Sequence, residues 1–235
     1  MHVSPAKAPA TRRPANPATT GRCRHLHRRR LIVLAVALAG SCVVWQQFLR
    51  DRLLPKRWQT VYAGRLYRSG QLSQALVRRV LETHGIRVVV DLTSRDPNVT
   101  DQDGELAACD ALGIEHARFP LEGDGTGDVG EYAAALARIH EAVERGEPVL
   151  VHCAAGVQRT GGVIAAYQLL VRRESPATVY RELTEDGMGR YPVNPTVPAY
   201  LNDHMQEIAD RLVQQGTLDA VPSPLPLLPE SDAEN

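Results

Sequence analysis

The sequence has few cysteines, and none lies in a pattern that would cross-link a small fold or bind a metal. The 235 residues include four cysteines, with no CxxC motif and no Cys/His spacing typical of a zinc site. We therefore expect no disulfide framework and no bound metal. Four histidines show no ligand spacing either: His84, His116, His140 and His204.

The sequence also lacks net charge, but its zero total combines two segments of opposite sign. Residues 1–57 hold twelve Lys/Arg and one acidic residue, a net charge of +11. Residues 58–235 hold fifteen Arg and twenty-six Asp/Glu, a net charge of −11. The two segments should differ in role. An acidic domain also argues against nucleic-acid binding, which uses a basic face.

Only one long hydrophobic run is present, and it follows a basic segment. Residues 1–30 are rich in Pro, Ala, Thr and Arg and are expected to be disordered. Residues 31–49 carry no charge and approach the ~20 residues of a membrane-spanning helix. The excess of positive charge before this run predicts a single-pass anchor with a cytoplasmic N-terminus and the domain on the far side. A cleaved signal peptide, or a lipoprotein box ending at Cys42, is the alternative.

After Trp58, short apolar runs alternate with amphipathic stretches, which predicts an α/β domain. We expect a central, mostly parallel sheet flanked by helices on both faces, over residues 58–216, followed by a disordered tail over 217–235. The expected strands lie in 59–70 (two, with the turn at Gly64), 86–92, 114–121 and 148–153. The expected helices lie in 73–85 (with Ser73 as N-cap), 103–113, 128–146, 160–173, 175–187 and 197–216.

The stretch VLVHCAAGVQRTGG, residues 149–162, joins a buried strand to a helix through a glycine-containing loop that begins at Cys153. Ligands of open α/β sheets bind at this end of the strands. A loop curled at Gly156 points its backbone N–H groups at an anion, and the helix N-terminus adds positive charge. Arg159 adds a planar fork that matches two phosphate oxygens. The predicted phosphate-binding residues are Ala154, Ala155, Gly156, Val157, Gln158 and Arg159.

The same positive surroundings should ionise the Cys153 thiol, because helix N-termini and nearby arginines lower a cysteine pKa from ~8.5 to ~3.5–7.5. A thiolate beneath a phosphate cradle predicts phosphoryl transfer to sulfur and then hydrolysis, with no cofactor. The Thr160 hydroxyl would stabilise the sulfur as a leaving group, and His152 would orient the loop. A purely structural buried cysteine is the competing interpretation.

The run from His152 to Gly161 fits the pattern HCxxGxxR[ST]G and resembles the signature of the cysteine-based protein tyrosine phosphatases. No tryptophan-containing acid loop is present, and the domain is more similar to the compact dual-specificity and atypical dual-specificity branch of bacterial type. The stretches LYRSGQLS and GIRVVVDL also resemble that branch. The resemblance spans residues 58–212. It implies a cysteine-phosphatase-like fold and a phosphorylated protein or small phosphate ester as substrate.

The family takes the proton for the leaving group from an aspartate on a loop some thirty residues before the cysteine. Asp124 lies twenty-nine residues before Cys153, between two glycines, and is the preferred general acid. Asp128 lies twenty-five residues before, where it is also suited to cap a helix. Glu122, thirty-one residues before, is the reserve candidate.

Other interpretations stay open at this point. The substrate can be a phosphoprotein or a phosphoinositide or inositol phosphate, although the loop lacks the lysines expected for the latter. A phosphate-binding module without turnover and a sulfurtransferase are the alternatives from other classes. Arg68 and Arg95 either line the pocket or are surface or ion-paired residues. Cys109 is either a core residue or a resolving thiol for Cys153.

Overall fold

The computed structural model describes residues 32, 34–38, 40–41, 50–186 and 193–229, and the chain divides into two units, Met1–Phe48 and Leu49–Asn235. The predicted disordered segment 1–30 and most of the predicted membrane helix 31–49 lie outside the described residues. Among the residues that are described, no helix is both long enough and apolar enough to cross a bilayer.

A five-stranded mixed sheet forms the centre of the second unit, with strand order β1-β2-β5-β3-β4. The first two strands form an antiparallel hairpin whose turn contains Gly64 at φ 70°. The other neighbours are all parallel, so the predicted, mostly parallel sheet is confirmed. The strands are β1 (Gln59–Tyr62), β2 (Leu66–Gly70), β3 (Val88–Asp91), β4 (Glu115–Arg118) and β5 (Val149–Cys153).

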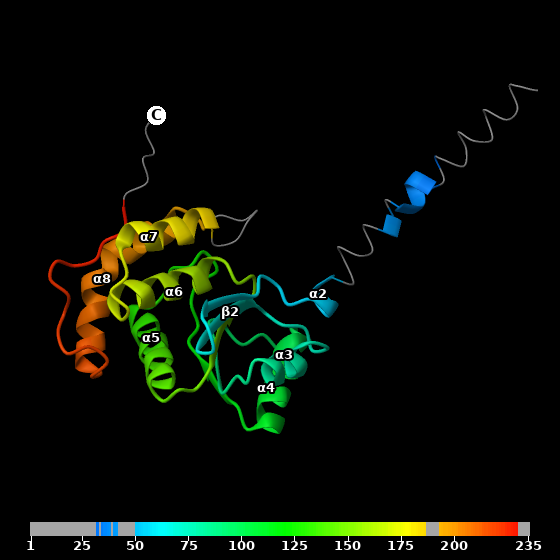
Figure 1. Ribbon diagram of the computed structural model, residues 1–235, viewed down its shortest axis with the longest axis horizontal. Coiled ribbons are helices and arrows are strands. Elements are labelled where there is room, and N and C mark those ends of the chain that lie inside the picture. Colours follow the sequence, from blue (N-terminus) through cyan, green and yellow to red (C-terminus); the bar gives the residue numbers. More distant parts are fainter. Residues whose placement is uncertain (1–31, 33, 39, 42–49, 187–192, 230–235) are drawn as a thin grey trace, which may run out of the picture. The chain divides into compact units, whose positions relative to one another are not determined.

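Helices cover both faces of the sheet, as the α/β pattern predicted (Figure 1). Side chains alternate along each strand, so Val88 and Val90 enter one core while Val89 enters the other. The smaller core lies under α3 (Val77–Thr83) and α4 (Thr100–Leu112). The larger core lies under α5 (Val129–Glu144), α6 (Gln158–Leu170) and α8 (Thr196–Gln214). In the described residues of the second unit, two further helices are α2 (Arg50–Leu53) and α7 (Pro176–Arg181), and α7 continues into the π-helical turn η2 (Glu182–Asp186).

The predicted N-cap of the first domain helix is wrong. α3 begins at Val77, and the Ser73 carbonyl accepts hydrogen bonds from the amides of Leu76 and Val77 at 2.9 and 3.0 Å. A hydrogen-bonded turn therefore precedes the helix, and the Ser73 hydroxyl does not cap it.

The predicted disordered tail is also wrong for residues 217–229. Leu218 and Leu228 are buried in the larger core. The Asn202 side chain on α8 holds the Leu228 backbone through two hydrogen bonds of 2.8 and 2.9 Å. Apolar side chains before and between the prolines thus pack the segment onto α8, and residues 230–235 lie outside the described part.

Candidate active site

Cys153 ends the central strand β5 and is 2% exposed. The loop that follows passes very close to the end of β2, because Gly70 is the register partner of Cys153. A Cβ atom on Gly156 would lie 2.5 Å from both the Gly70 nitrogen and the Ser69 oxygen, and Gly156 has φ 74°. Only glycine fits both the conformation and the space at this position.

The carbonyls of three successive loop residues are bound by donors from outside the loop. The Ala154 oxygen accepts from the Gln71 amide at 3.2 Å, and the Ala155 oxygen accepts from Arg57 Nη1 at 2.7 Å. The Gly156 oxygen accepts from Arg68 Nη2 at 3.2 Å. The Gly156 amide donates to Cys153 Sγ at 3.2 Å. Carbonyls held away in this manner leave the amides to form an anion-binding concavity beside the sulfur.

The pKa of the Cys153 thiol lies below its ordinary value. Burial opposes ionisation, but the nearby hydroxyl and amide of Thr160, the charge of Arg159 and the Gly156 amide together outweigh it. Thr160 is itself fully buried at the start of α6. The surroundings therefore favour a thiolate, which is the nucleophilic form of cysteine.

Arg159 spans the ends of two neighbouring segments. Its Nη1 donates to the Leu92 carbonyl at 3.3 Å and to the Leu121 carbonyl at 3.5 Å. Its Nε is buried and has no hydrogen-bond partner among the described residues. The guanidinium is thus fixed in place while retaining an N–H group that can serve an oxyanion.

Asp124 lies on an exposed loop and its carboxylate is engaged locally. Asp124 Oδ1 accepts from the Thr126 amide at 3.0 Å and from the Thr126 hydroxyl at 2.8 Å. These two hydrogen bonds hold the pKa of Asp124 below its ordinary value. A general acid must carry a proton when it acts. Its assignment as the acid therefore stays a prediction.

Two tyrosines attach the Asp124 loop to the helices beside the cysteine. The buried Tyr132 hydroxyl donates to the Gly125 carbonyl, and the Tyr200 hydroxyl donates to the Gly127 carbonyl at 2.6 Å. A Cβ atom on Gly125 would lie 3.1 Å from the backbone of Gln158. The loop therefore packs on the first turn of α6, next to the loop that follows Cys153.

The other two candidate acids are placed differently. The Asp128 side chain accepts from the Glu131 amide at 3.1 Å and is the N-cap of α5, as its position at a helix start predicted. The Glu122 side chain is exposed, and its backbone closes the turn through hydrogen bonds to Thr126 and Gly125. Asp128 therefore serves as a helix cap and Glu122 as part of a turn, and Asp124 lies between them in the sequence.

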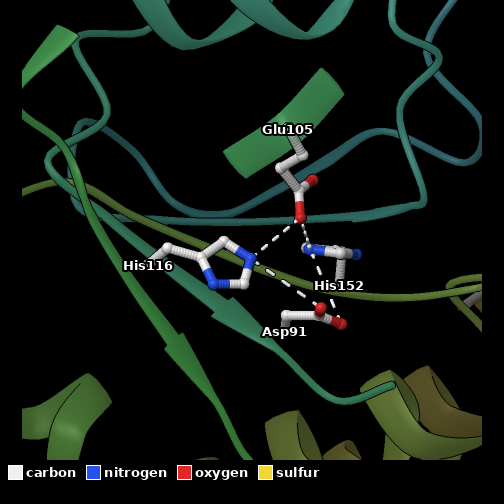
Figure 2. A group of neighbouring side chains, drawn as sticks. All are labelled: Asp91, Glu105, His116 and His152. Carbon is white, nitrogen blue, oxygen red and sulfur yellow. Dashed lines mark hydrogen bonds and ion pairs between the residues drawn. The ribbon is translucent and has the colours of Figure 1, made fainter. Parts of the chain in front are cut away.

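His152 is fully buried in a group of four titratable side chains that the sequence did not predict (Figure 2). Glu105 Oε1 lies 3.0 Å from His152 Nε2 and 3.1 Å from His116 Nε2. Burial lowers the pKa of His152, but the charges of Glu105 and Asp91 outweigh it and raise this pKa to about 9. The two histidines conversely lower the pKa of the buried Glu105 carboxyl to about 2. His152 is therefore a cation held by the adjacent carboxylates.

The donor atoms of Asp91, Glu105, His116 and His152 all lie within 4.8 Å of one another, a composition that can hold a metal ion. In the structure these atoms are occupied by their own ion pairs, and Arg118 Nη2 also lies 2.8 Å from Asp91 Oδ2. We therefore assign an ion-pair network to the group. Spacing along the chain could not reveal it, because its members come from β3, α4, β4 and β5. In the sequence, the one sign of this network was Asp91, an acidic residue at the end of a predicted buried strand.

The remaining candidate residues have structural roles or lie away from the Cys153 sulfur. Cys109 is 1% exposed in the smaller core, whereas Cys153 belongs to the larger one. Burial raises the pKa of the Cys109 thiol to about 12, so it is a core residue and poorly suited to resolve an oxidised Cys153. Arg95 is ion-paired with Asp103 near the surface. His84 stacks on Trp58 with ring centroids 4.3 Å apart, and His204 stacks on Tyr200 at 4.4 Å.

Comparisons with known proteins agree with this geometry. Residues 67–174 match the family described as "Polymorphic toxin system, DSP-PTPase phosphatase". The dual specificity protein phosphatase OPG106 of vaccinia virus (strain Copenhagen) is 44% identical over 68 residues, which are 28% of this chain and 40% of the viral protein. Its monkeypox virus counterpart is 42% identical over a match of the same length. The chain thus spans less than half of these relatives.

Solved structures share the fold at lower sequence identity. TpbA of P. aeruginosa is 22% identical with a TM-score of 0.51, and the match covers 68% of this chain and 91% of that one. The core catalytic domain of the PP-IP phosphatase SIW14 from S. cerevisiae is 19% identical with a TM-score of 0.53, covering 68% and 94%. Residues 67–174 are therefore similar in sequence to the dual-specificity phosphatases of the cysteine-based protein tyrosine phosphatase superfamily, and the domain shares the fold of these solved structures.

Proposed function

We propose that this protein is a cysteine-dependent phosphatase that hydrolyses phosphate monoesters through a phosphocysteine intermediate. The observation that carries the proposal is the loop after Cys153, whose three outward-held carbonyls leave amides and a thiol of lowered pKa on the inner side. An anion-binding loop around a thiolate is suited to phosphoryl transfer, because negative charge on the transferred group is stabilised where the nucleophile attacks.

In the first step Cys153 Sγ attacks phosphorus and the bond between phosphorus and the leaving oxygen breaks. Asp124 donates its proton to that oxygen, so the alcohol or phenol departs neutral. Arg159 and the loop amides bind the three non-bridging oxygens throughout. In the second step Asp124 removes a proton from water, which attacks phosphorus. The sulfur–phosphorus bond then breaks, and Thr160 stabilises the departing thiolate.

The protonation state of Asp124 must change when substrate binds. In the structure Thr126 stabilises the carboxylate. A phosphate dianion bound beside it repels that negative charge and raises the carboxyl pKa. The charge of the bound substrate would therefore favour the protonated form of Asp124, which can then protonate the leaving group.

We favour a phosphoprotein substrate, either phosphotyrosine or both phosphotyrosine and phosphoserine/threonine. The viral relatives are named dual specificity protein phosphatases, and one solved TpbA structure is a complex with pTyr. Inositol phosphates carry many negative charges, and the loop offers Ala154, Ala155 and Gln158 where a lysine would be expected for them. Arg57 and Arg68 bind loop carbonyls instead of facing outward. The inositol phosphate alternative is therefore the weaker one.

Hydrolysis of para-nitrophenyl phosphate by the full chain tests the proposal, with Cys153→Ser as the active-site variant and Cys109→Ser as its matched control. We expect turnover in the wild type and in Cys109→Ser, and none in Cys153→Ser. A folded, reduced wild type that binds phosphate but does not turn over would support a phosphate-binding module instead. Thiocyanate formation from thiosulfate and cyanide would indicate a sulfurtransferase.

We further propose that residues 31–49 anchor the protein in a membrane as a single pass, with the N-terminus in the cytoplasm and the domain on the far side. The proposal is supported by the uncharged run and by eight Lys/Arg before it against four soon after it. Topology reporters fused before residue 31 and after the domain test it. Recovery of a shortened chain in the soluble fraction would favour cleavage.

A further inference from the structure

Arg68 is a buried cation in the strand next to the catalytic one. It lies on β2, where its register partner is Val151 of β5, two residues before Cys153. The residue is 6% exposed, and its Nη2 donates to the Gly156 carbonyl at 3.2 Å. A Cβ atom on Gly161 would lie 3.7 Å from the same Nη2. Arg68 therefore lies beneath the loop, between its turn and the start of α6.

Among the described residues no carboxylate forms an ion pair with Arg68, and its Nε lacks a hydrogen-bond partner there. A buried charge without such a partner is costly. The N-terminus of α6 and Arg159 add further positive charge to the same place. Accordingly, burial lowers the pKa of Arg68 to about 10, and the attraction opposing this comes first from Cys153 and then from Glu182.

We propose that Arg68 is a positioning residue of the active site, which holds the Gly156 carbonyl away from the phosphate and balances the negative charge of the Cys153 sulfur and the transferred phosphoryl group. This inference rests on the proposed function and deepens it. The buried cation is stabilised by the anion that the site is built to hold. Arg68 acts through the loop, whereas Arg159 serves the phosphate oxygens directly.

Arg57 supplies a natural comparison within the same loop. It donates to the Ala155 carbonyl at 2.7 Å, so it makes the same kind of hydrogen bond one residue earlier. That bond is exposed to solvent, where charge is screened and a single contact contributes little. If hydrogen bonds to loop carbonyls were all that mattered, the two arginines would be equivalent.

The test compares Arg68→Lys, which keeps the charge, with Arg68→Gln, which keeps an N–H donor but loses the charge. Arg57→Gln is the exposed control. Iodoacetamide alkylation of Cys153 in the full chain is followed by peptide mass spectrometry across pH, alongside kcat/KM for an aryl phosphate. Among the described residues, the titratable or charged groups whose charge acts on Cys153 are Arg68 from β2, His152 from β5, Arg159 from α6 and Tyr132 from α5.

We expect Arg68→Gln to move the midpoint of alkylation upward by about one pH unit and to lower kcat/KM about ten-fold or more, as expected for loss of a charged hydrogen-bond partner. Arg68→Lys should recover most of both changes, and Arg57→Gln should stay within about two-fold of wild type. The midpoint needs no turnover, so it remains readable even if the wild type proves inactive and the proposed function fails.

Three results would overturn the inference. One is an unchanged midpoint in Arg68→Gln. Another is an equal loss in the lysine and glutamine variants, which would indicate a steric role. The last is a Glu182→Gln variant whose alkylation midpoint moves by as much as that of Arg68→Gln. That result would show that Glu182, and not the Cys153 thiolate, balances the charge of Arg68. Thermal melting of each variant identifies any that fails to fold, and the lysine variant then decides.

Discussion

The loop from Cys153 to Arg159 and the loop from Leu121 to Asp128 pack against each other but are held by different contacts. In the first, side chains from β2 and from the segment before β1 bind backbone carbonyls, the Gly156 amide binds the sulfur, and the thiol is buried. In the second, the carboxylate of Asp124 is exposed, and within the described part of the chain its hydrogen bonds come from its neighbour Thr126. Contacts from several parts of the fold therefore hold the proposed nucleophile, whereas a local turn holds the carboxylate of the proposed acid.

This contrast predicts that the acid can be removed without disturbing the nucleophile. Asp124→Asn should lower kcat by about 10²–10⁴ for a phenyl phosphate with a poor leaving group, because no proton reaches the phenoxide. The loss should be much smaller for an aryl phosphate whose phenol is strongly acidic, since that group leaves without help. Steady-state kinetics on the two substrates measure the difference. Equal losses on both would remove Asp124 from the acid role.

A substitution at Gly156 should disturb the loop from Cys153 to Arg159 and leave the Asp124 loop unchanged. Gly156→Ala places a Cβ 2.5 Å from backbone atoms of β2 and strains a residue at φ 74°. A shift of the loop by about 1 Å is expected to cost about 10²-fold in kcat/KM. Gly123→Ala in the Asp124 loop is the matched control, because a Cβ there meets nothing within 4 Å. If the two alanine variants behaved alike, the difference in constraint between the loops would be refuted.

The ion-pair network around His152 should contribute to the free energy of unfolding. Glu105→Gln leaves the buried His152 without its carboxylate, and breaking a buried ion pair costs about 3–5 kcal/mol of the free energy of unfolding. Chemical denaturation at neutral pH measures the loss. Substituting the exposed Glu82, which pairs with Arg78 on the surface, supplies the control and should cost well under that amount.

The same network predicts how stability changes with pH. The pKa of His152 rises from 6.5 to about 9 on folding, so its contribution is complete below pH 6.5 and is lost as pH rises through 9. The pKa of Glu105 falls from 4.5 to about 2, so its contribution is complete above pH 4.5 and is lost as pH falls toward 2. Melting temperatures across pH should show both slopes, and Glu105→Gln should flatten them.

The smallest expected effect is that of a substitution at Thr126, in the turn that holds the Asp124 carboxylate. Thr126→Val removes the hydroxyl that donates to Asp124 while leaving the amide hydrogen bond. With one donor fewer, the pKa of Asp124 should rise toward its ordinary value and the acid should stay protonated to higher pH. The alkaline limb of the kcat/KM profile would then move to higher pH. An unmoved limb would mean that another group supplies the proton.

Sequence alone predicted the parts of this site that are contiguous. Cys153, Gly156, Arg159 and Thr160 lie within eight residues, and the chemistry of each residue type points to the same anion. The strand, loop and helix around them follow from apolar periodicity. The parallel sheet followed for the same reason.

What sequence could not predict depends on contacts across the sheet. Parallel register brings Arg68 under the loop and sets Asp91 beside His152, although each pair is separated by sixty or more residues. Prolines after Thr217 suggested disorder, yet Leu218 and Leu228 are spaced so that they bury against α8. Long-range packing, which no local pattern encodes, decided these cases.

The segment just before β1 contacts the loop that follows Cys153, so the folded domain begins before Trp58. Arg57 binds the Ala155 carbonyl, and the Lys56 carbonyl accepts from the Gly70 amide at 2.8 Å, at the strand end that touches Gly156. A protein trimmed at Trp58 would keep every strand but would lose both contacts. The residues between the hydrophobic run and the sheet thus contribute to the folded domain, and cleavage at Trp58 would remove their contacts with the end of β2 and with the loop after Cys153.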